Sequence, residues 1–279
     1  MLDNPKYSRL LLNKVEEWLK NKNVNKIVGP INSSLENYTG FQLKGFNQIS
    51  TPSLTYTKKY YIKHMRKNNY NHIKKLNAYI INLDEFNVST LKPLHNNIRT
   101  NIRPLNIKEF DIESRSILDI INNSFPDDYF GFRKINIDEW KFLIESLRPL
   151  INPEDILIYE ENKKPIGVLF SIPNINIILR TIKLKNDFIR KLLLFFRKNS
   201  ISMRVISLIC IKRNNTQKGI GSYLMSAYIT QAKKRGIKNI EYSWVYDDNQ
   251  VSKSLINRFN GRKYKIYQLF QKTLVKNHK

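Results

Sequence analysis

The sequence has very little cysteine and no long apolar run. Its one cysteine, Cys210, excludes an internal disulfide framework, and an apolar neighbourhood predicts that this side chain is buried as a small hydrophobe. The longest apolar runs, such as residues 192–196, are far shorter than the ~20 residues that cross a bilayer. The first residues lack the basic and then apolar plan of a signal peptide. We therefore expect a soluble, cytoplasmic protein without membrane insertion.

Acidic residues are scarce, with 23 Asp and Glu against 48 Lys and Arg. The formal net charge of +25 attracts polyanions without sequence selectivity and in a salt-dependent way. Three interpretations of this charge stay open: a solvated lysine-rich surface, attraction of a polyanionic cofactor, and non-specific contact with nucleic acid. Helix-turn-helix, zinc-ligand and aromatic RNA-binding patterns are missing. The four histidines are scattered, which predicts surface positions and no metal site.

What the chain does contain is enough apolar material for a large core. Hydrophobic residues make up 41% of the sequence and aromatic residues 11%, which is typical of a folded globular protein. A length of 279 residues fits one large domain or two ordinary ones.

A glycine turn between a strand and a helix is the most informative motif. The apolar residues 203–211 predict a strand, Gly219 and Gly221 follow it, and a helix begins at the second glycine. Such a turn presents backbone N–H groups at the positive end of a helix dipole, which favours a phosphate or pyrophosphate ligand. A Rossmann fingerprint needs a third glycine where Leu224 stands, and a P-loop needs Lys-Ser/Thr where Ser222-Tyr223 stands. A bare turn without a ligand is the remaining alternative.

Further elements flank this motif in a regular order. Downstream we expect a strand at 238–245, a helix at 250–259 closed by Gly261, and a last strand at 263–269. Upstream we expect strands at 101–105, 155–160 and 165–173, with helices at 112–122 and 137–147.

The turn and its surroundings resemble the Gcn5-related N-acetyltransferases (GNAT). Gly219 and Gly221 match the last two positions of the acyl-CoA signature Arg/Gln-x-x-Gly-x-Gly/Ala, whereas Thr216 departs from the first and Gln217 lies beside it. Other strings resemble an uncharacterised two-part branch of that superfamily and cover nearly the whole chain in order. They are Val28-Gly-Pro-Ile-Asn32, Gly40, Gly45-Phe46, Tyr60-Tyr61, Phe130-Gly-Phe132, Ile166 to Asn176, Glu241 to Asn249, and Gly261 to Tyr267.

This resemblance implies a fold and a ligand. The fold would be α/β (α+β), a GNAT-like mixed sheet flanked by helices and preceded by a partial GNAT-like pseudo-repeat. Acetyl-CoA or another acyl-CoA would be the co-substrate, with no metal. Its pantetheine arm would pair with backbone near Ile209 and Ile211, and its pyrophosphate would meet the turn. The turn residues implied are Gln217, Lys218, Gly219, Ile220, Gly221 and Ser222, and Asn249 would lie near the cofactor's arm.

The residues expected to transfer protons depart from the family's pattern. The family usually places a proton-donating tyrosine seven residues after the Asn, but position 256 is Ile. Tyr246, Tyr264, Tyr267 or water would have to substitute, or catalysis is lost. Glu241 is the best-placed carboxylate for a general base, and a structural carboxylate is its alternative reading.

The N-terminal part reads as a degenerate copy of the same architecture. We expect a helix at 5–20 that buries Leu11, Val15, Trp18 and Leu19, a strand at 26–28, an irregular stretch, a helix at 60–67 and a strand at 78–83. All three tryptophans, Trp18, Trp140 and Trp244, are most simply core residues. The predicted organisation is a truncated degenerate GNAT-like segment at 1–86 without acyl-CoA, a linker at 87–100, and a GNAT-like N-acetyltransferase domain at 101–279.

The sequence therefore predicts an acyl-CoA-dependent N-acyltransferase, most simply an N-acetyltransferase. The amine it acts on stays open among amino acids, polyamines, antibiotics, peptide N-termini and lysine side chains. The alternative is a non-catalytic GNAT-fold binding module that contacts nucleic acid through its basic surface. Oligomeric state is not predicted.

Overall fold

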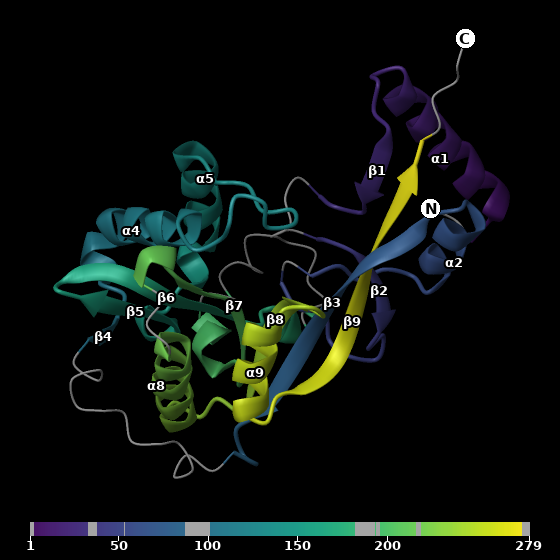
Figure 1. The fold of residues 1–279 in the computed structure, drawn as a ribbon. Coiled ribbons are helices and arrows are strands. Elements are labelled where there is room, and N and C mark those ends of the chain that lie inside the picture. The colour runs from purple at the N-terminus through teal and green to yellow at the C-terminus, as the bar shows by residue number, and fades with distance from the viewer. Residues whose placement is uncertain are drawn as a thin grey trace. The chain divides into compact units, whose positions relative to one another are not determined.

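The chain forms two compact units, described in a computed structural model (Figure 1). The structure describes residues 3–32, 38–52, 54–86, 101–181, 193, 196–215 and 219–274. The smaller unit comprises Met1–Ala78, Val245–Gln250 and Lys263–Lys279, and the larger unit comprises Tyr79–Trp244 and Val251–Arg262. The strands β3 (Asn71–Asn82), β8 (Asn239–Tyr246) and β9 (Arg262–Thr273) each contain residues of both units.

The larger unit is built on a mixed sheet with helices against both faces. Its strands run in the order β8-β7-β6-β5-β4, antiparallel except for the parallel pair β7–β8, which α8 connects. In Figure 1, α4 and α5 lie on one side of this sheet and α8 on the other. The elements are β4 (Ile102–Pro104), α4 (Phe110–Asn122), α5 (Ile137–Leu147), β5 (Ile156–Glu161), β6 (Lys164–Pro173), α6 (Asn176–Leu179), β7 (Met203–Ile211), α8 (Ile220–Lys234) and α9 (Gln250–Arg258).

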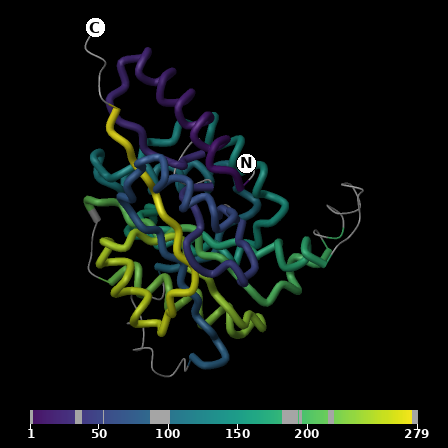
Figure 2. Tube along the Cα trace, turned by 90° about the vertical axis from the view of Figure 1, so that its right-hand side faces the viewer, coloured from purple at the N-terminus to yellow at the C-terminus, as the bar shows by residue number. Residues whose placement is uncertain are grey.

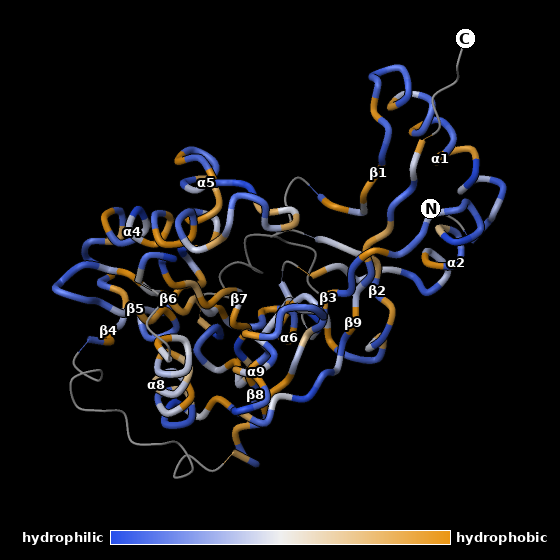
Figure 3. Tube along the Cα trace, in the orientation of Figure 1, coloured by the Kyte–Doolittle hydropathy of each residue, from blue (hydrophilic) through white to orange (hydrophobic). Residues whose placement is uncertain are grey.

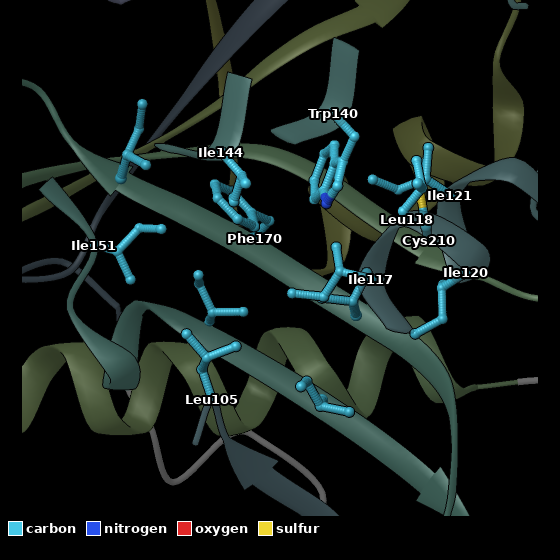
Figure 4. Close-up of a cluster of buried hydrophobic side chains, with 14 of the residues drawn as sticks. Leu105, Ile117, Leu118, Ile120, Ile121, Trp140, Ile144, Ile151, Phe170 and Cys210 are labelled. Carbon is cyan, nitrogen blue, oxygen red and sulfur yellow. The ribbon is translucent and has the colours of Figure 1, made fainter. Parts of the chain in front are cut away.

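The core of the larger unit lies between α4, α5 and one face of the sheet (Figure 4). Ile156 and Ile158 of β5 belong to it, as expected because alternate residues of a strand share a face. Trp140 and Cys210 also lie in this core, which confirms both as buried residues. Burial raises the pKa of the Cys210 thiol to about 12, so the side chain behaves as a small hydrophobe.

A buried ionic cluster joins three elements of the larger unit. Asp155, which follows Asn152 in the turn before β5, is fully buried and accepts hydrogen bonds from three side chains. The donors are Arg204 Nε of β7 at 2.9 Å, Arg235 Nη1 after α8 at 2.8 Å, and Tyr228 Oη of α8 at 3.3 Å. The cluster therefore fixes α8 and β7 to the start of β5.

The smaller unit is organised around β9. Its other elements are α1 (Pro5–Lys20), β1 (Lys26–Gly29), β2 (Phe41–Lys44), α2 (Tyr60–Lys67) and the first part of β3. The strands β1 and β2 both pair antiparallel with β9, β1 near its end and β2 near its middle. Figure 2 shows β9 in yellow beside the purple segment that contains β1. The core of this unit contains Ile62 and Met65 of α2, Tyr70, and Phe270 of β9.

Most predicted elements are confirmed. The helices at 5–20, 60–67 and 137–147 and the strand at 203–211 have the predicted limits. Two predictions in the smaller unit are wrong: the stretch expected to be irregular contains β2, and β3 begins at Asn71 instead of 78. The first residues of β3 showed no strand pattern in the sequence, because Asn71 and His72 are polar and exposed there. The predicted linker at 87–100 lies outside the described residues, and the predicted domain limits remain a prediction.

The predicted inner face of α1 is wrong. Leu11, Val15 and Trp18 are exposed and Leu19 is half-buried, whereas Ser8 and Glu16 are buried. The physical reason is a set of polar contacts on the inner side of the helix. There Glu16 accepts hydrogen bonds from Lys272 of β9 and from Tyr70, which directly precedes β3. Trp18 is therefore not a core residue, and Trp244 is half-buried.

One histidine also departs from prediction. His64 of α2 is 1% exposed, and its Nε2 lies 3.0 Å from Asp3 Oδ1, whereas His72 is exposed as predicted.

Candidate active site

The strands β7 and β8 separate halfway along their length. Their parallel pairing runs from Met203 opposite Asn239 to Ile206 opposite Tyr242, and both strands continue beyond the last pair. We call the opening after this pair the fork. A strand whose neighbour has moved away can offer its backbone N–H and C=O groups to an extended ligand, as in strand addition.

A bulge lies on β7 at the fork. In the pairing of β7 with β6, Phe170 faces Leu208 and Ser171 faces Ile206, so Ser207 has no counterpart on β6. Such an extra residue bends a strand and re-aims its edge. The bulge therefore accounts for the point at which β7 leaves β8.

The helix α8 begins at the glycine turn. Gly219 has a φ of +116° and is the N-cap of α8, a conformation that side-chain-bearing residues rarely adopt. The N–H of Tyr223 donates to the Gly219 carbonyl at 3.0 Å, so Ile220, Gly221 and Ser222 precede the first helical hydrogen bond. Their N–H groups point out of the helix end, where the dipole favours an anion. Gln217 and Lys218 lie outside the described residues.

The turn and the fork adjoin each other at Gly221. A Cβ built on this glycine would lie 3.8 Å from Ile209 Cγ2, 3.8 Å from Ile211 Cδ1 and 4.0 Å from Leu255 Cδ2. These are ordinary contacts, so the protein's own packing does not require glycine here. A ligand that needs close approach to the backbone supplies a reason for it, and the pyrophosphate of an acyl-CoA fits that description. The structure thus brings Ile209, Ile211 and Gly221 together.

Arg258 adds a positive charge at the same helix end. Its Nη1 donates to Ser222 Oγ at 3.0 Å, and the side chain is exposed at the end of α9. This residue was missed by the sequence analysis because it is distant in the chain from the turn and belongs to no motif. It places a guanidinium beside the N–H groups that would meet a phosphate.

Tyr242 is a second residue that the sequence analysis missed. It forms the last pair before the fork and is buried, and burial raises its pKa to about 12. A hydrogen bond with the Ser252 side chain of α9 acts in the opposite direction and lowers it. The hydroxyl is therefore protonated at neutral pH. As a β-former in an apolar strand, Tyr242 carried no signal beyond a core position.

The residues predicted for acid–base chemistry lie on β8 and β9. Glu241 is fully buried in the paired part of β8, opposite Val205. This burial favours its reading as a structural carboxylate. Ile256 is also fully buried. Asn249 lies directly before α9 and belongs to the smaller unit. The three candidate tyrosines, Tyr246, Tyr264 and Tyr267, belong to the same unit.

Neither a metal centre nor a membrane span is found in the part of the chain that the structure describes. No group of three or more His, Cys, Asp or Glu side chains there could hold a metal ion. Among the described helices, none combines the length and the apolar character that a bilayer crossing requires.

Comparison with known proteins decides what kind of fold this is. A sequence model described as the acetyltransferase (GNAT) family matches residues 115–261, which include β5 to β8, the glycine turn and α9. The chain belongs to this family. The GNAT fold is also found in a GCN5-related N-acetyltransferase from Sphaerobacter thermophilus, which superposes with a TM-score of 0.53 at 15% identity. That match covers 78% of this chain and 57% of the solved one, so the chain spans little more than half of it.

Two curated relatives match over almost the whole chain. Protein YghO of Escherichia coli (strain K12) is 23% identical over 98% of this chain and 72% of its own length. The Bacterial ceramide synthase of Caulobacter vibrioides is 23% identical over 98% of this chain and 73% of its own length. GNAT proteins generally bind acetyl-CoA.

Proposed function

We propose that this GNAT protein is an acyl-CoA-dependent N-acyltransferase. The observation that carries the proposal is the meeting of the fork with the glycine turn at Gly221, where Ile209 and Ile211 adjoin a helix end that favours an anion. A long ligand with a pyrophosphate at one end and an extended arm at the other matches both features. Acyl-CoA has this plan, and acetyl-CoA is the simplest donor.

The protein's part in such a reaction is mainly positioning. The N–H groups of Ile220, Gly221 and Ser222 and the Arg258 guanidinium would bind the pyrophosphate. The free edge of β7 would hold the arm in line, so that the thioester carbonyl lies in the fork. A new N–C bond then forms as the C–S bond breaks, the amine loses a proton and the leaving thiolate gains one.

Tyr242 is our candidate for the group that gives this proton. It sits at the fork and is protonated at neutral pH, so its hydroxyl can donate a hydrogen bond, and then its proton, to the leaving sulfur. We assign no general base. Water and the predicted Glu241 both remain open, although the burial of Glu241 counts against it.

The acceptor amine is suggested only by relatives. Because one of them is named a Bacterial ceramide synthase, a long-chain amine with a long-chain acyl-CoA is the first pair to assay. Acetyl-CoA with amino acids, polyamines and peptides forms the second set. Product formation, followed by mass spectrometry, identifies the pair.

Binding of the donor tests the proposal directly. Isothermal titration with acetyl-CoA and a long-chain acyl-CoA should show binding to the wild type and none to Gly221→Glu, which blocks the turn and adds a negative charge. Gly221→Ala should keep the fold, because its Cβ meets only ordinary contacts, and should bind acyl-CoA more weakly than the wild type, because the Cβ holds the pyrophosphate away from the backbone. Equal affinity of the folded Gly221→Glu variant would show that the turn holds no pyrophosphate.

The buried Ile256 favours one second candidate, a GNAT-fold module that binds without catalysis. Such a module would bind acyl-CoA, or nucleic acid through the +25 charge, and give no product with any amine. Affinity for nucleic acid that stays high and sequence-selective above ~0.2 M salt would favour this candidate, since diffuse phosphate contacts fail over that range.

A further inference from the structure

The outer surface of α1 carries an apolar stripe. Tyr7, Leu11, Val15 and Trp18 recur at intervals of four, four and three residues, which places them on one side of the helix. All four are exposed, with Leu11 at 57% and Trp18 at 61%. We call these four residues the α1 stripe. Figure 3 shows orange apolar residues and blue polar residues mixed along this helix.

The side of α1 next to the stripe is held in place by polar contacts. Glu16 accepts hydrogen bonds from Lys272 Nζ at 2.8 and 2.9 Å and from Tyr70 Oη at 3.1 Å. Ser8 is fully buried, and Asn68 Nδ2 donates to its hydroxyl at 3.5 Å. A rotation that buried the α1 stripe would break these contacts and leave buried polar groups unpaired, which is costly. These contacts therefore keep the α1 stripe exposed, although an ordinary surface helix turns its apolar residues toward the core.

The charge around the helix indicates what covers the α1 stripe. Residues 3–32 contain six Lys and Arg but three Asp and Glu, and the whole chain carries +25. A second copy of the chain would bring the same charge and be repelled. A negatively charged surface would be attracted, and Trp and Tyr side chains favour the boundary between lipid headgroups and acyl chains. At 16 residues, α1 is too short to cross a bilayer and suits a position parallel to it.

We propose that α1 docks the protein on phospholipid surfaces that carry anionic headgroups. The α1 stripe enters the headgroup boundary, while Lys14, three residues after Leu11 and four before Trp18, lies on the same side of the helix and meets the lipid phosphates. This docking does not depend on the proposed acyl transfer, because it uses residues of the smaller unit alone.

Vesicle flotation with the full chain tests the proposal. The wild type should bind vesicles of equal parts phosphatidylcholine and phosphatidylserine, and bind phosphatidylcholine alone at least about tenfold more weakly. The variant Leu11→Ser/Trp18→Ser keeps the charge and should bind the mixed vesicles at least about tenfold more weakly than the wild type. The control is Phe142→Ser, which removes an exposed aromatic residue from α5 of the larger unit and should bind like the wild type. Circular dichroism verifies that each variant is folded.

Tryptophan fluorescence supplies an independent measurement. Mixed vesicles should shift the wild-type emission to shorter wavelength as Trp18 leaves water, and Trp18→Phe should lose the shift while still binding. The proposal is overturned if the wild type does not bind mixed vesicles, or if the double variant binds them equally well. It is also overturned if light scattering shows a dimer that the double variant abolishes, since the stripe then joins two copies. The proposal would also be contradicted if the double variant lost its affinity for RNA and kept its affinity for lipid vesicles.

Discussion

Ile256 and Gly261 pack closely against each other at the position where the family usually has a tyrosine. Ile256 is fully buried, and a Cβ on Gly261 would lie 2.3 Å from its Cγ2. A side chain at 256 thus occupies the space that any residue other than glycine would need at 261. The larger ring of a tyrosine would require room that the pair does not have. A proton donor in this protein has to come from another position.

Tyr242 supplies the first prediction at the residue scale. Once the amine is known, Tyr242→Phe should lower turnover about 100-fold while leaving acetyl-CoA affinity unchanged, because only the proton transfer is lost. Steady-state kinetics and titration calorimetry separate the two effects. The control is Tyr159→Phe, another buried tyrosine, which should retain full activity. Unchanged turnover in Tyr242→Phe would remove the hydroxyl from the mechanism.

Cys210 makes the free energy of unfolding depend on pH in the alkaline range. Burial raises the thiol's pKa from its ordinary 9.0 to about 12, so above pH 9 the unfolded chain loses this proton before the folded chain does. The contribution of the protonated thiol is therefore fully present below the lower pKa and declines as pH rises toward the higher one. Urea unfolding at several pH values should show the stability gap between wild type and Cys210→Ala narrowing by about 1.4 kcal/mol per pH unit above pH 9. A gap independent of pH would contradict the buried neutral thiol.

At the scale of elements, the Asp155 cluster should control how firmly α8 is held. Asp155→Ala leaves Arg204 without its buried carboxylate and should lower the free energy of unfolding by about 3–5 kcal/mol. Chemical denaturation measures the change. Glu145→Ala breaks the exposed ion pair with Arg148 and should cost about 1 kcal/mol or less. Equal losses in the two variants would mean that the buried cluster adds nothing special.

Elements with a strong local pattern were predictable from the sequence. The helix α5 begins at Asn136, whose side chain and that of Glu139 cap each other's backbone, and this signal lies within four residues. The strand β7 is apolar except for Arg204 and Ser207, and it needed no distant partner to be recognised. In contrast, the inner side of α1 is chosen by Glu16 and its contact with Lys272, and no local pattern encodes a contact over such a separation.

The same limit applies to the candidate site. Gly219 and Gly221 were found because a turn at a helix start has a short-range signature. Arg258 and Tyr242 were not, because their position at the turn and the fork follows from the packing of α9 and the register of β8. Gln217 and Lys218 remain predictions.

At the scale of the whole molecule, residues 1–85 should not fold alone. The strands β1 and β2 pair with β9, so a fragment ending at 85 lacks the strand around which the smaller unit is built. We expect no cooperative thermal transition for this fragment by circular dichroism. The full chain is the control and should melt cooperatively. A sharp transition in the fragment would show that its core suffices without β9.

The position of β9 also sets an order of events during protein synthesis. The helices α1 and α2 and the strands β1 and β2 leave the ribosome early, but their partner strand β9 begins 218 residues after the end of β2. At 5–20 residues per second, they wait for roughly 10 to 40 seconds. Throughout that interval the unpaired edges of β1 and β2 and the apolar side of α1 are open to chaperones, to lipid, or to neighbouring nascent chains.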